Sequence, residues 1–168
     1  GTVIDLAKAE NVSIPSHDEP ELAKILTVQG RVDDLPKYLE KFDITLSVMQ
    51  TAESLHRTAY ELAEDAAKDN VRYMEVRYSP ILHQQRGLEL EKIVDSVLAG
   101  LREAEQDFNI RTGVIICGIR SINPKTSELL AELAVAYKGK GVVAFDLAGA
   151  EANNPAKDHV KAFYIVRN

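Results

Sequence analysis

From residue 71 onward, the sequence alternates three times between a short apolar run and a longer amphipathic run. The short runs cover about 71–78, 112–119 and 142–147, and the longer runs cover about 90–108, 124–137 and the residues after Asn154-Pro155. Short runs rich in Val, Ile and Tyr are typical of strands, whereas apolar residues spaced three or four apart are typical of helices. This alternation predicts an α/β fold with a parallel sheet.

Two of the expected strands are apolar without interruption at their centres, at Val114-Ile115-Ile116 and Val142-Val143-Ala144-Phe145. Continuous apolar runs are expected where both faces of a parallel sheet are buried. The helix after the second strand has a clear start, because Asn123 is a good N-cap and Pro124 suits the first turn. We therefore expect three parallel strands, each followed by a helix, with the second and third strands buried on both faces.

The first 70 residues have helical rather than strand-like patterns. We expect a short helix around Val3–Ala7, a second that begins at Pro20, a third from Leu35 to Leu46, and a fourth from Ala52 to Lys68. No linker separates these helices from the strands. The sequence thus predicts one α/β unit over 1–168, with a helical region at 1–70 and βα units at 71–168.

Composition narrows the class of protein. The chain has 168 residues, a net charge of −6 and a pI near 5.3, so a nucleic-acid partner is disfavoured. No apolar run approaches the roughly 20 residues that a transmembrane helix needs, so we expect no membrane partner. Cys117 is the one cysteine, which rules out an internal disulfide and fits a reducing, cytoplasmic location.

The residues that commonly carry catalysis are sparse. His17, His56, His83 and His159 form no His-x-His or His-x-x-x-His pair, and we interpret them as surface or helix-face residues. Cys117 lies in an apolar strand and reads as a small core residue. No glycine-rich phosphate loop or dinucleotide fingerprint occurs. We therefore predict no catalytic residue and no metal ligand in this chain.

Polar residues at the ends of the strands are the better candidates for a site. Ligands of parallel α/β folds bind at the carboxyl ends of the strands. Glu75 and Arg77 share one face of the first strand, and a charge there needs a partner, so both are candidates for an internal ion-pair network. Asp146 ends the third strand. Gly149 follows it, where a backbone without a side chain can approach a ligand closely.

Three segments carry a resemblance to a known family. They are Leu35-Pro36-x-Tyr38-Leu39-x-Lys41-Phe42-Asp43, Glu75-Val76-Arg77-Tyr78-Ser79-Pro80 and Asp146-Leu147-Ala148-Gly149-x-Glu151. In this order and spacing they resemble the adenosine deaminases, which are zinc-dependent amidohydrolases, over essentially the whole chain. Position 150 is Ala where the family often has Asp.

The resemblance implies a fold and a set of site residues. It implies part of a (β/α)₈ TIM-type barrel, about strands two to four, with the N-terminal helices as a lid. Three parallel strands alone would also fit a small doubly wound domain, but 168 residues are too few for a closed barrel of roughly 250. By resemblance, the substrate-binding residues are Gly149 against the purine, Leu35, Tyr38, Leu39 and Phe42 in the lid, and Ser79, Leu82 and Ile119 in the pocket, with Asp146 and Arg77 supporting them.

The implied chemistry is hydrolytic deamination of adenosine and deoxyadenosine, a small-molecule purine nucleoside reaction that depends on Zn²⁺. The family's His-x-His and His-Ala-Gly-Glu motifs do not occur in this sequence. The chain would therefore supply the lid and one wall of the site, be inactive alone, and have the remaining part of the barrel as a partner. Two alternatives stay open: a related adenine or AMP deaminase, and a non-catalytic α/β binding module.

Overall fold

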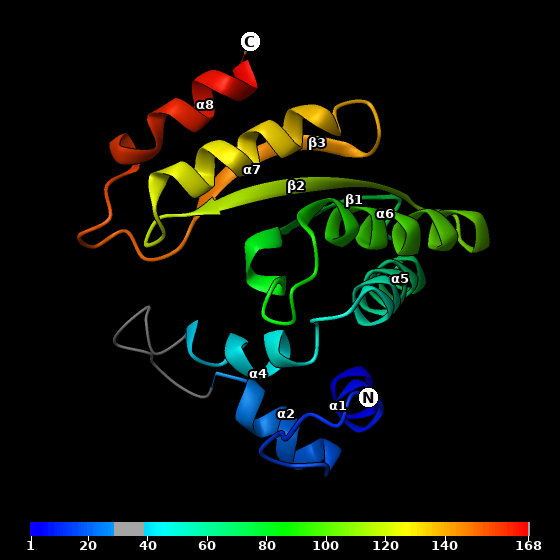
Figure 1. The fold of residues 1–168 in the computed structure, drawn as a ribbon. Coiled ribbons are helices and arrows are strands. Elements are labelled where there is room, and N and C mark those ends of the chain that lie inside the picture. Colours follow the sequence, from blue (N-terminus) through cyan, green and yellow to red (C-terminus); the bar gives the residue numbers. More distant parts are fainter. Residues whose placement is uncertain (29–38, 168) are drawn as a thin grey trace.

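A parallel three-stranded sheet lies at the centre of the computed structural model, which describes residues 1–28 and 39–167 (Figure 1). The strands β1 (Tyr73–Tyr78), β2 (Arg111–Ile119) and β3 (Val142–Ala148) lie in the order β1-β2-β3. Both neighbouring pairs are parallel, with Val76 beside Val114 and Cys117 beside Asp146. The predicted α/β alternation is confirmed.

Helices precede the sheet and connect its strands. The described α-helices are α1 (Thr2–Ala9), α2 (Glu19–Leu26), α4 (Phe42–Ser47), α5 (Ala52–Lys68), α6 (Leu90–Asp107), α7 (Pro124–Ala136) and α8 (Val160–Arg167), and the short 3₁₀ helices are η1 (Pro80–His83) and η2 (Ala156–His159). In Figure 1, α1, α2 and α4 lie below the sheet, and α8 lies above α7. No described helix is both long and apolar enough to cross a membrane.

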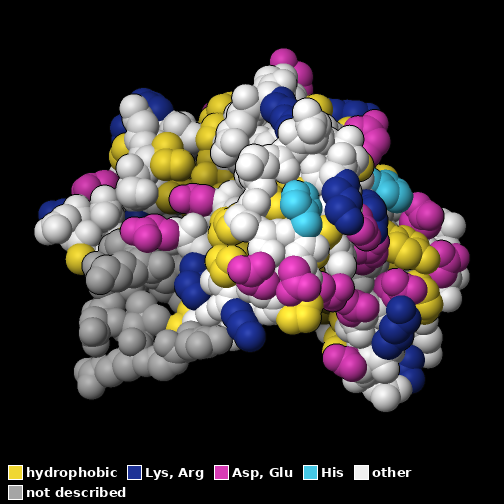
Figure 2. All heavy atoms as spheres, turned by 90° about the horizontal axis from the view of Figure 1, so that it is seen from below, with side chains coloured by type: hydrophobic (Ala, Val, Ile, Leu, Met, Phe, Trp, Pro, Cys, Tyr) yellow, Lys and Arg dark blue, Asp and Glu magenta, His cyan; other side chains and the backbone are white. Residues whose placement is uncertain are grey.

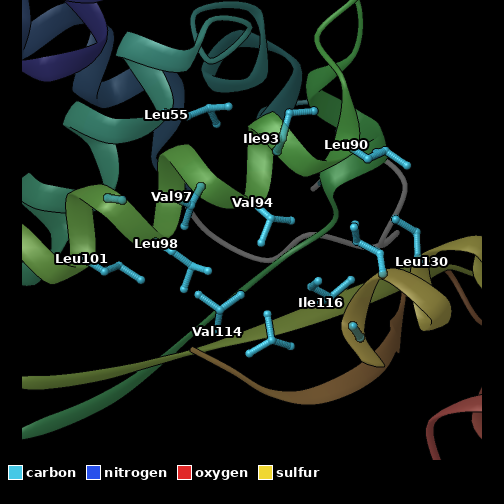
Figure 3. Packing of buried hydrophobic residues seen from close by; sticks show 14 of the residues in the cluster. Leu55, Leu90, Ile93, Val94, Val97, Leu98, Leu101, Val114, Ile116 and Leu130 are labelled. Carbon is cyan, nitrogen blue, oxygen red and sulfur yellow. The ribbon is translucent and has the colours of Figure 1, made fainter. Parts of the chain in front are cut away.

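The main core lies between β2 and the helix α6 (Figure 3). Val114 and Ile116 of β2 are fully buried, and they meet the apolar stripe of α6 that includes Ile93 and Leu101. Burying each such side chain contributes roughly 1.5–3 kcal/mol. Gly100 lets α5 approach α6, since a Cβ there would lie 2.2 Å from the carbonyl oxygen of His56.

The opposite face of the sheet is open in the described structure. Tyr73, Glu75 and Arg77 of β1 are exposed, and Val143 of β3 is 53% exposed. Burial on both faces was expected for β2 and β3, and this expectation is therefore wrong for β3. The reason is that burial depends on what covers a face, and among the described residues helices cover only one.

Local signals explain most helix starts. The hydroxyl of Thr51 accepts from the backbone N–H of Ser54 at 3.1 Å, which caps α5. Asn123 caps α7 by accepting from Lys125, as predicted. One predicted helix needs correction: the chain turns at residues 40–41, and α4 begins only at Phe42. Lys41 holds this turn near α2 by donating to the carbonyl oxygen of Thr27 at 2.6 Å.

Candidate functional site

A cavity of about 770 Å³ lies where the three strands end. Its sheet side is formed by residues at or just after the strand ends, among them Ser79, Ile119 and Gly149. Its other side is formed by α4 and the residues before it, including Leu39 and Phe42, with α5 contributing further apolar residues. The carboxyl ends of parallel strands are the usual place for a ligand, and this volume suits a small organic molecule.

The structure brings most of the predicted site residues together. Leu39, Phe42, Arg77, Ser79, Leu82, Ile119 and Gly149 all line the one cavity. Leu35 and Tyr38 lie outside the described residues. Asp146 is not a lining residue, but it contacts the cavity wall through Arg77. The individual roles of these residues stay predictions.

Arg77 and Asp146 form an ion pair across β2. Nη1 of Arg77 donates to Oδ2 of Asp146, and the two side chains are 55% and 40% exposed. Glu75 does not join this pair and accepts instead from the hydroxyl of Tyr73 at 2.7 Å. Of the two candidates for an ion-pair network, Arg77 thus has an acidic partner, whereas the partner of Glu75 is the hydroxyl of Tyr73.

Cys117 lies between the two charges and is 4% exposed, as expected of a core residue. Burial raises the pKa of its thiol to about 11, while the nearby Arg77 charge lowers it and the Asp146 charge raises it. A thiol with such a pKa is protonated near neutral pH and is a poor nucleophile. Cys117 therefore contributes shape, not covalent chemistry, to the cavity wall.

Three buried hydroxyl groups of cavity-lining residues have no hydrogen-bond partner in the described structure: those of Thr58, Tyr78 and Ser79. Ser79 is only 3% exposed. A buried polar group without a partner is costly, so such groups are expected to meet a ligand or a water molecule. Ser79 is thus the predicted residue with a clear capacity to bind a polar ligand atom.

Gln50 and His83 connect α4 to the segment after β1. The Gln50 amide, 2% exposed, donates to the carbonyl oxygens of Leu46 at 2.8 Å and Leu82 at 3.0 Å. Nδ1 of His83 donates to the carbonyl oxygen of Met49 at 2.8 Å. Burial lowers the pKa of His83, although this hydrogen bond partly offsets the effect. These contacts hold the two sides of the cavity together.

The sequence did not reveal these two residues. His83 and His159 were interpreted as surface or helix-face residues, but they are only 4% and 2% exposed. Each histidine has polar partners that lie more than 30 residues away in the chain. No periodic pattern reports such contacts. The one local signal for Gln50 is its place between an apolar helix and the capping residue Thr51.

Gly149 has a backbone φ of +107°, a conformation that favours glycine. Space is not the constraint, because an added Cβ would lie at an ordinary 3.5 Å from Cγ2 of Ile119. The glycine is therefore required by the turn that ends β3, and its backbone faces the cavity wall formed by Ile119.

Metal binding needs several converging donors. Across residues 1–28 and 39–167, no three His, Cys, Asp or Glu side chains come close enough to hold a metal ion. The described residues thus do not fit a zinc site by themselves.

Curated relatives match this chain over part of their length. A probable adenosine deaminase of Dictyostelium discoideum is 42% identical over 167 residues, which are 99% of this chain and 22% of that protein. An adenosine deaminase of Clostridium botulinum is 42% identical over 157 residues, which are 93% of this chain and 47% of that protein. The chain thus spans less than half the length of these relatives.

Solved structures share the fold. An adenine deaminase from Arthrobacter aurescens has a TM-score of 0.84 at 23% identity, with 99% of this chain and 49% of that chain covered. A zinc-bound amidohydrolase from Burkholderia ambifaria has a TM-score of 0.83 at 23% identity, with 99% and 44% covered. An Arabidopsis protein called ADAL, solved with GMP, has a TM-score of 0.77 at 21% identity, with 99% and 50% covered.

These matches confirm the predicted fold class, since nearly the whole chain superposes on about half of each of these structures. The family profile described as adenosine deaminase matches residues 1–168. By this match over its full sequence, the chain belongs to the adenosine deaminase family.

Proposed function

We propose that this chain supplies the lid and one wall of a purine nucleoside site in an enzyme that deaminates adenosine and deoxyadenosine by hydrolysis. The observation that carries the proposal is the convergence of Phe42, Ser79 and Gly149 on one cavity at the strand ends. In a member of this family, that cavity is the natural place for the substrate.

The described residues suit binding and orientation of a nucleoside. Leu39 and Phe42 present apolar surface to a flat purine and exclude water from it. The backbone of Gly149 approaches closely because it carries no side chain. Ser79 offers a hydroxyl with no partner in the described structure. Asp146 supports the wall by pairing with Arg77.

Zinc belongs to the proposal for the complete enzyme only. A structural neighbour contains bound zinc, but the described residues form no cluster of three metal-binding side chains. The ligands of the zinc ion would therefore come from elsewhere in the complete protein.

The charge of the cavity favours a nucleoside over a nucleotide. Among the described lining residues, Arg77 is the only Lys or Arg, and Asp146 already neutralises it. A 5′-phosphate would favour unpaired cations. The apolar residues at 39–46 extend the cavity beyond the strand ends, which favours a nucleoside over a free base. AMP and adenine remain the alternative substrates, and a non-catalytic binding module is the alternative of another class.

The open sheet suggests how the chain fits into a larger protein. We propose that residues 1–70 form the lid region and residues 71–168 the βα units, and that α5 joins them because Leu55 lies in the main core. The exposed Tyr73 and Val143 would then face the remaining part of the barrel.

The test compares substrates on the full-length protein. Adenosine, deoxyadenosine, adenine and AMP are assayed by the absorbance change of deamination, before and after chelation and after Zn²⁺ is restored. We expect zinc-dependent turnover of adenosine and deoxyadenosine, and none by the 168-residue chain alone. Preference for adenine or AMP would select the corresponding alternative, and purine binding without turnover would favour a non-catalytic module.

A further inference from the structure

Arg120, the residue directly after β2, contacts the segment after β3 in several places. Its side chain is 16% exposed, and Nη2 donates to the Glu151 carboxylate at 2.8 Å while Nη1 lies 3.4 Å from the carbonyl oxygen of Asn154. Its backbone N–H donates to the carbonyl oxygen of Ala148 at 2.8 Å. One residue thus holds both the end of β3 and the loop that follows.

A buried histidine holds Arg120 in turn. Nε2 of His159 donates to the carbonyl oxygen of Arg120 at 3.1 Å. Nδ1 of the same ring is hydrogen-bonded to the hydroxyl of Ser127 at 2.8 Å. Ser127 and His159 are 1% and 2% exposed. The contacts therefore run from α7 through η2 to Arg120 without exposure to solvent at either buried residue.

These contacts end beside Gly149. A Cβ placed on Gly149 would lie 3.6 Å from the backbone nitrogen of Arg120 and 3.9 Å from its Cβ. Gly149 has a positive φ, and a glycine has little conformational restriction of its own. Its orientation toward the cavity must therefore be fixed by the residues around it.

We propose that Arg120 is a positioning residue that fixes the backbone of Gly149 against the bound nucleoside, a role that rests on the proposed function. An exposed ion pair with Glu151, which is 77% exposed, would contribute little alone. Two further features make Arg120 different: its guanidinium is mostly buried, and it binds a carboxylate and a carbonyl group at once. Lysine has a single ammonium group and cannot reproduce that geometry.

The first experiment uses Arg120→Gln, Arg120→Lys and the milder Glu151→Gln in the full-length protein. Hydrogen exchange of residues 149–155 is measured without ligand, and KM and kcat are measured for adenosine. We expect faster exchange in this loop and a KM raised about tenfold for Arg120→Gln, with kcat within about twofold, and an intermediate KM for Arg120→Lys. The control is Arg102→Gln, because Arg102 also donates to a loop carbonyl, that of Lys140, outside the cavity lining.

A double-mutant cycle separates positioning from general stability. If Arg120 acts through Gly149, the effects of Arg120→Gln and Gly149→Ala on KM are less than additive, whereas independent losses of stability add. Unchanged exchange and unchanged KM, or additive effects, would overturn the proposal. If the wild-type protein binds no nucleoside, the proposed function fails. Faster hydrogen exchange in Arg120→Gln would then show only that Arg120 stabilises the loop at 149–155, and its proposed role in nucleoside binding would be overturned.

Discussion

The guanidinium of Arg77 on β1 pairs with the carboxylate of Asp146 on β3, across the central strand of the sheet. Because both side chains are about half exposed, the pair contributes little to stability, of the order of 0–1 kcal/mol. Its larger effect is on the charge of the cavity. Arg77 is the only Lys or Arg among the described lining residues, and Asp146 neutralises it.

We therefore predict that Asp146→Asn changes ligand preference more than stability. Arg77 would be left unpaired at the cavity wall, so the affinity for AMP relative to adenosine should rise several-fold. Binding of both ligands to the full-length protein, measured by calorimetry, checks this. Asp5→Asn is the control, since it removes one carboxylate partner of Arg57, a similarly exposed arginine that keeps its pair with Glu61 and does not line the cavity. An unchanged AMP to adenosine ratio would contradict the prediction.

Phe42→Ala is expected to weaken nucleoside binding with little loss of stability. Phe42 lines the cavity and is 47% exposed, so its truncation should fall well below the 3–5 kcal/mol typical of a core phenylalanine. KM for adenosine and the melting temperature are measured together. Phe108→Ala is the control, because Phe108 packs against the main core outside the cavity. It should lower the melting temperature and leave KM unchanged, and the same pattern in Phe42→Ala would make Phe42 structural.

Gly149→Val should abolish nucleoside binding in a protein that still folds. Valine is strained at a φ of +107°, at a cost of about 1–3 kcal/mol, and its side chain would stand beside Ile119 in the cavity. Gly139→Val is the matched control. Its φ is +75°, so it carries comparable strain, but an added Cβ there meets nothing within 4 Å. Circular dichroism and adenosine binding distinguish the two, and normal binding by Gly149→Val would show Gly149 to be an ordinary turn residue.

Local sequence patterns predicted the bounds of helices and strands better than they predicted the burial and contacts of those elements. The helix Ala52–Lys68 was expected with its observed bounds, and β2 begins one residue before its expected start, because periodicity and caps are properties of the local sequence. The exposed face of β3, which includes Val143, was missed, since burial depends on distant segments. Gln50 and His83 were missed for the same reason: their partners lie 32 and 34 residues away. The sequence has 20 Lys and Arg residues against 26 Asp and Glu residues, and both kinds of side chain are intermixed on the face shown in Figure 2.

His83 predicts a pH dependence of stability. Burial lowers its pKa below the ordinary 6.5 in the folded protein, so between these two values the unfolded chain binds a proton that the folded chain does not. The free energy of unfolding should therefore fall as the pH drops through about 6.5, with a slope of at most about 1.4 kcal/mol per pH unit, and the loss should end below the folded pKa.

Urea unfolding of the wild type and of His83→Gln at several pH values between 7.5 and 5.5 checks this. The glutamine amide can still donate to the carbonyl oxygen of Met49, but it does not titrate. The stability difference between wild type and variant should therefore shift in favour of the variant as the pH falls. Gln50→Ala is the control, because it breaks neighbouring contacts between α4 and η1 without removing a titrating group. A difference for His83→Gln that stays constant with pH would show that the buried imidazole makes no proton-linked contribution to stability.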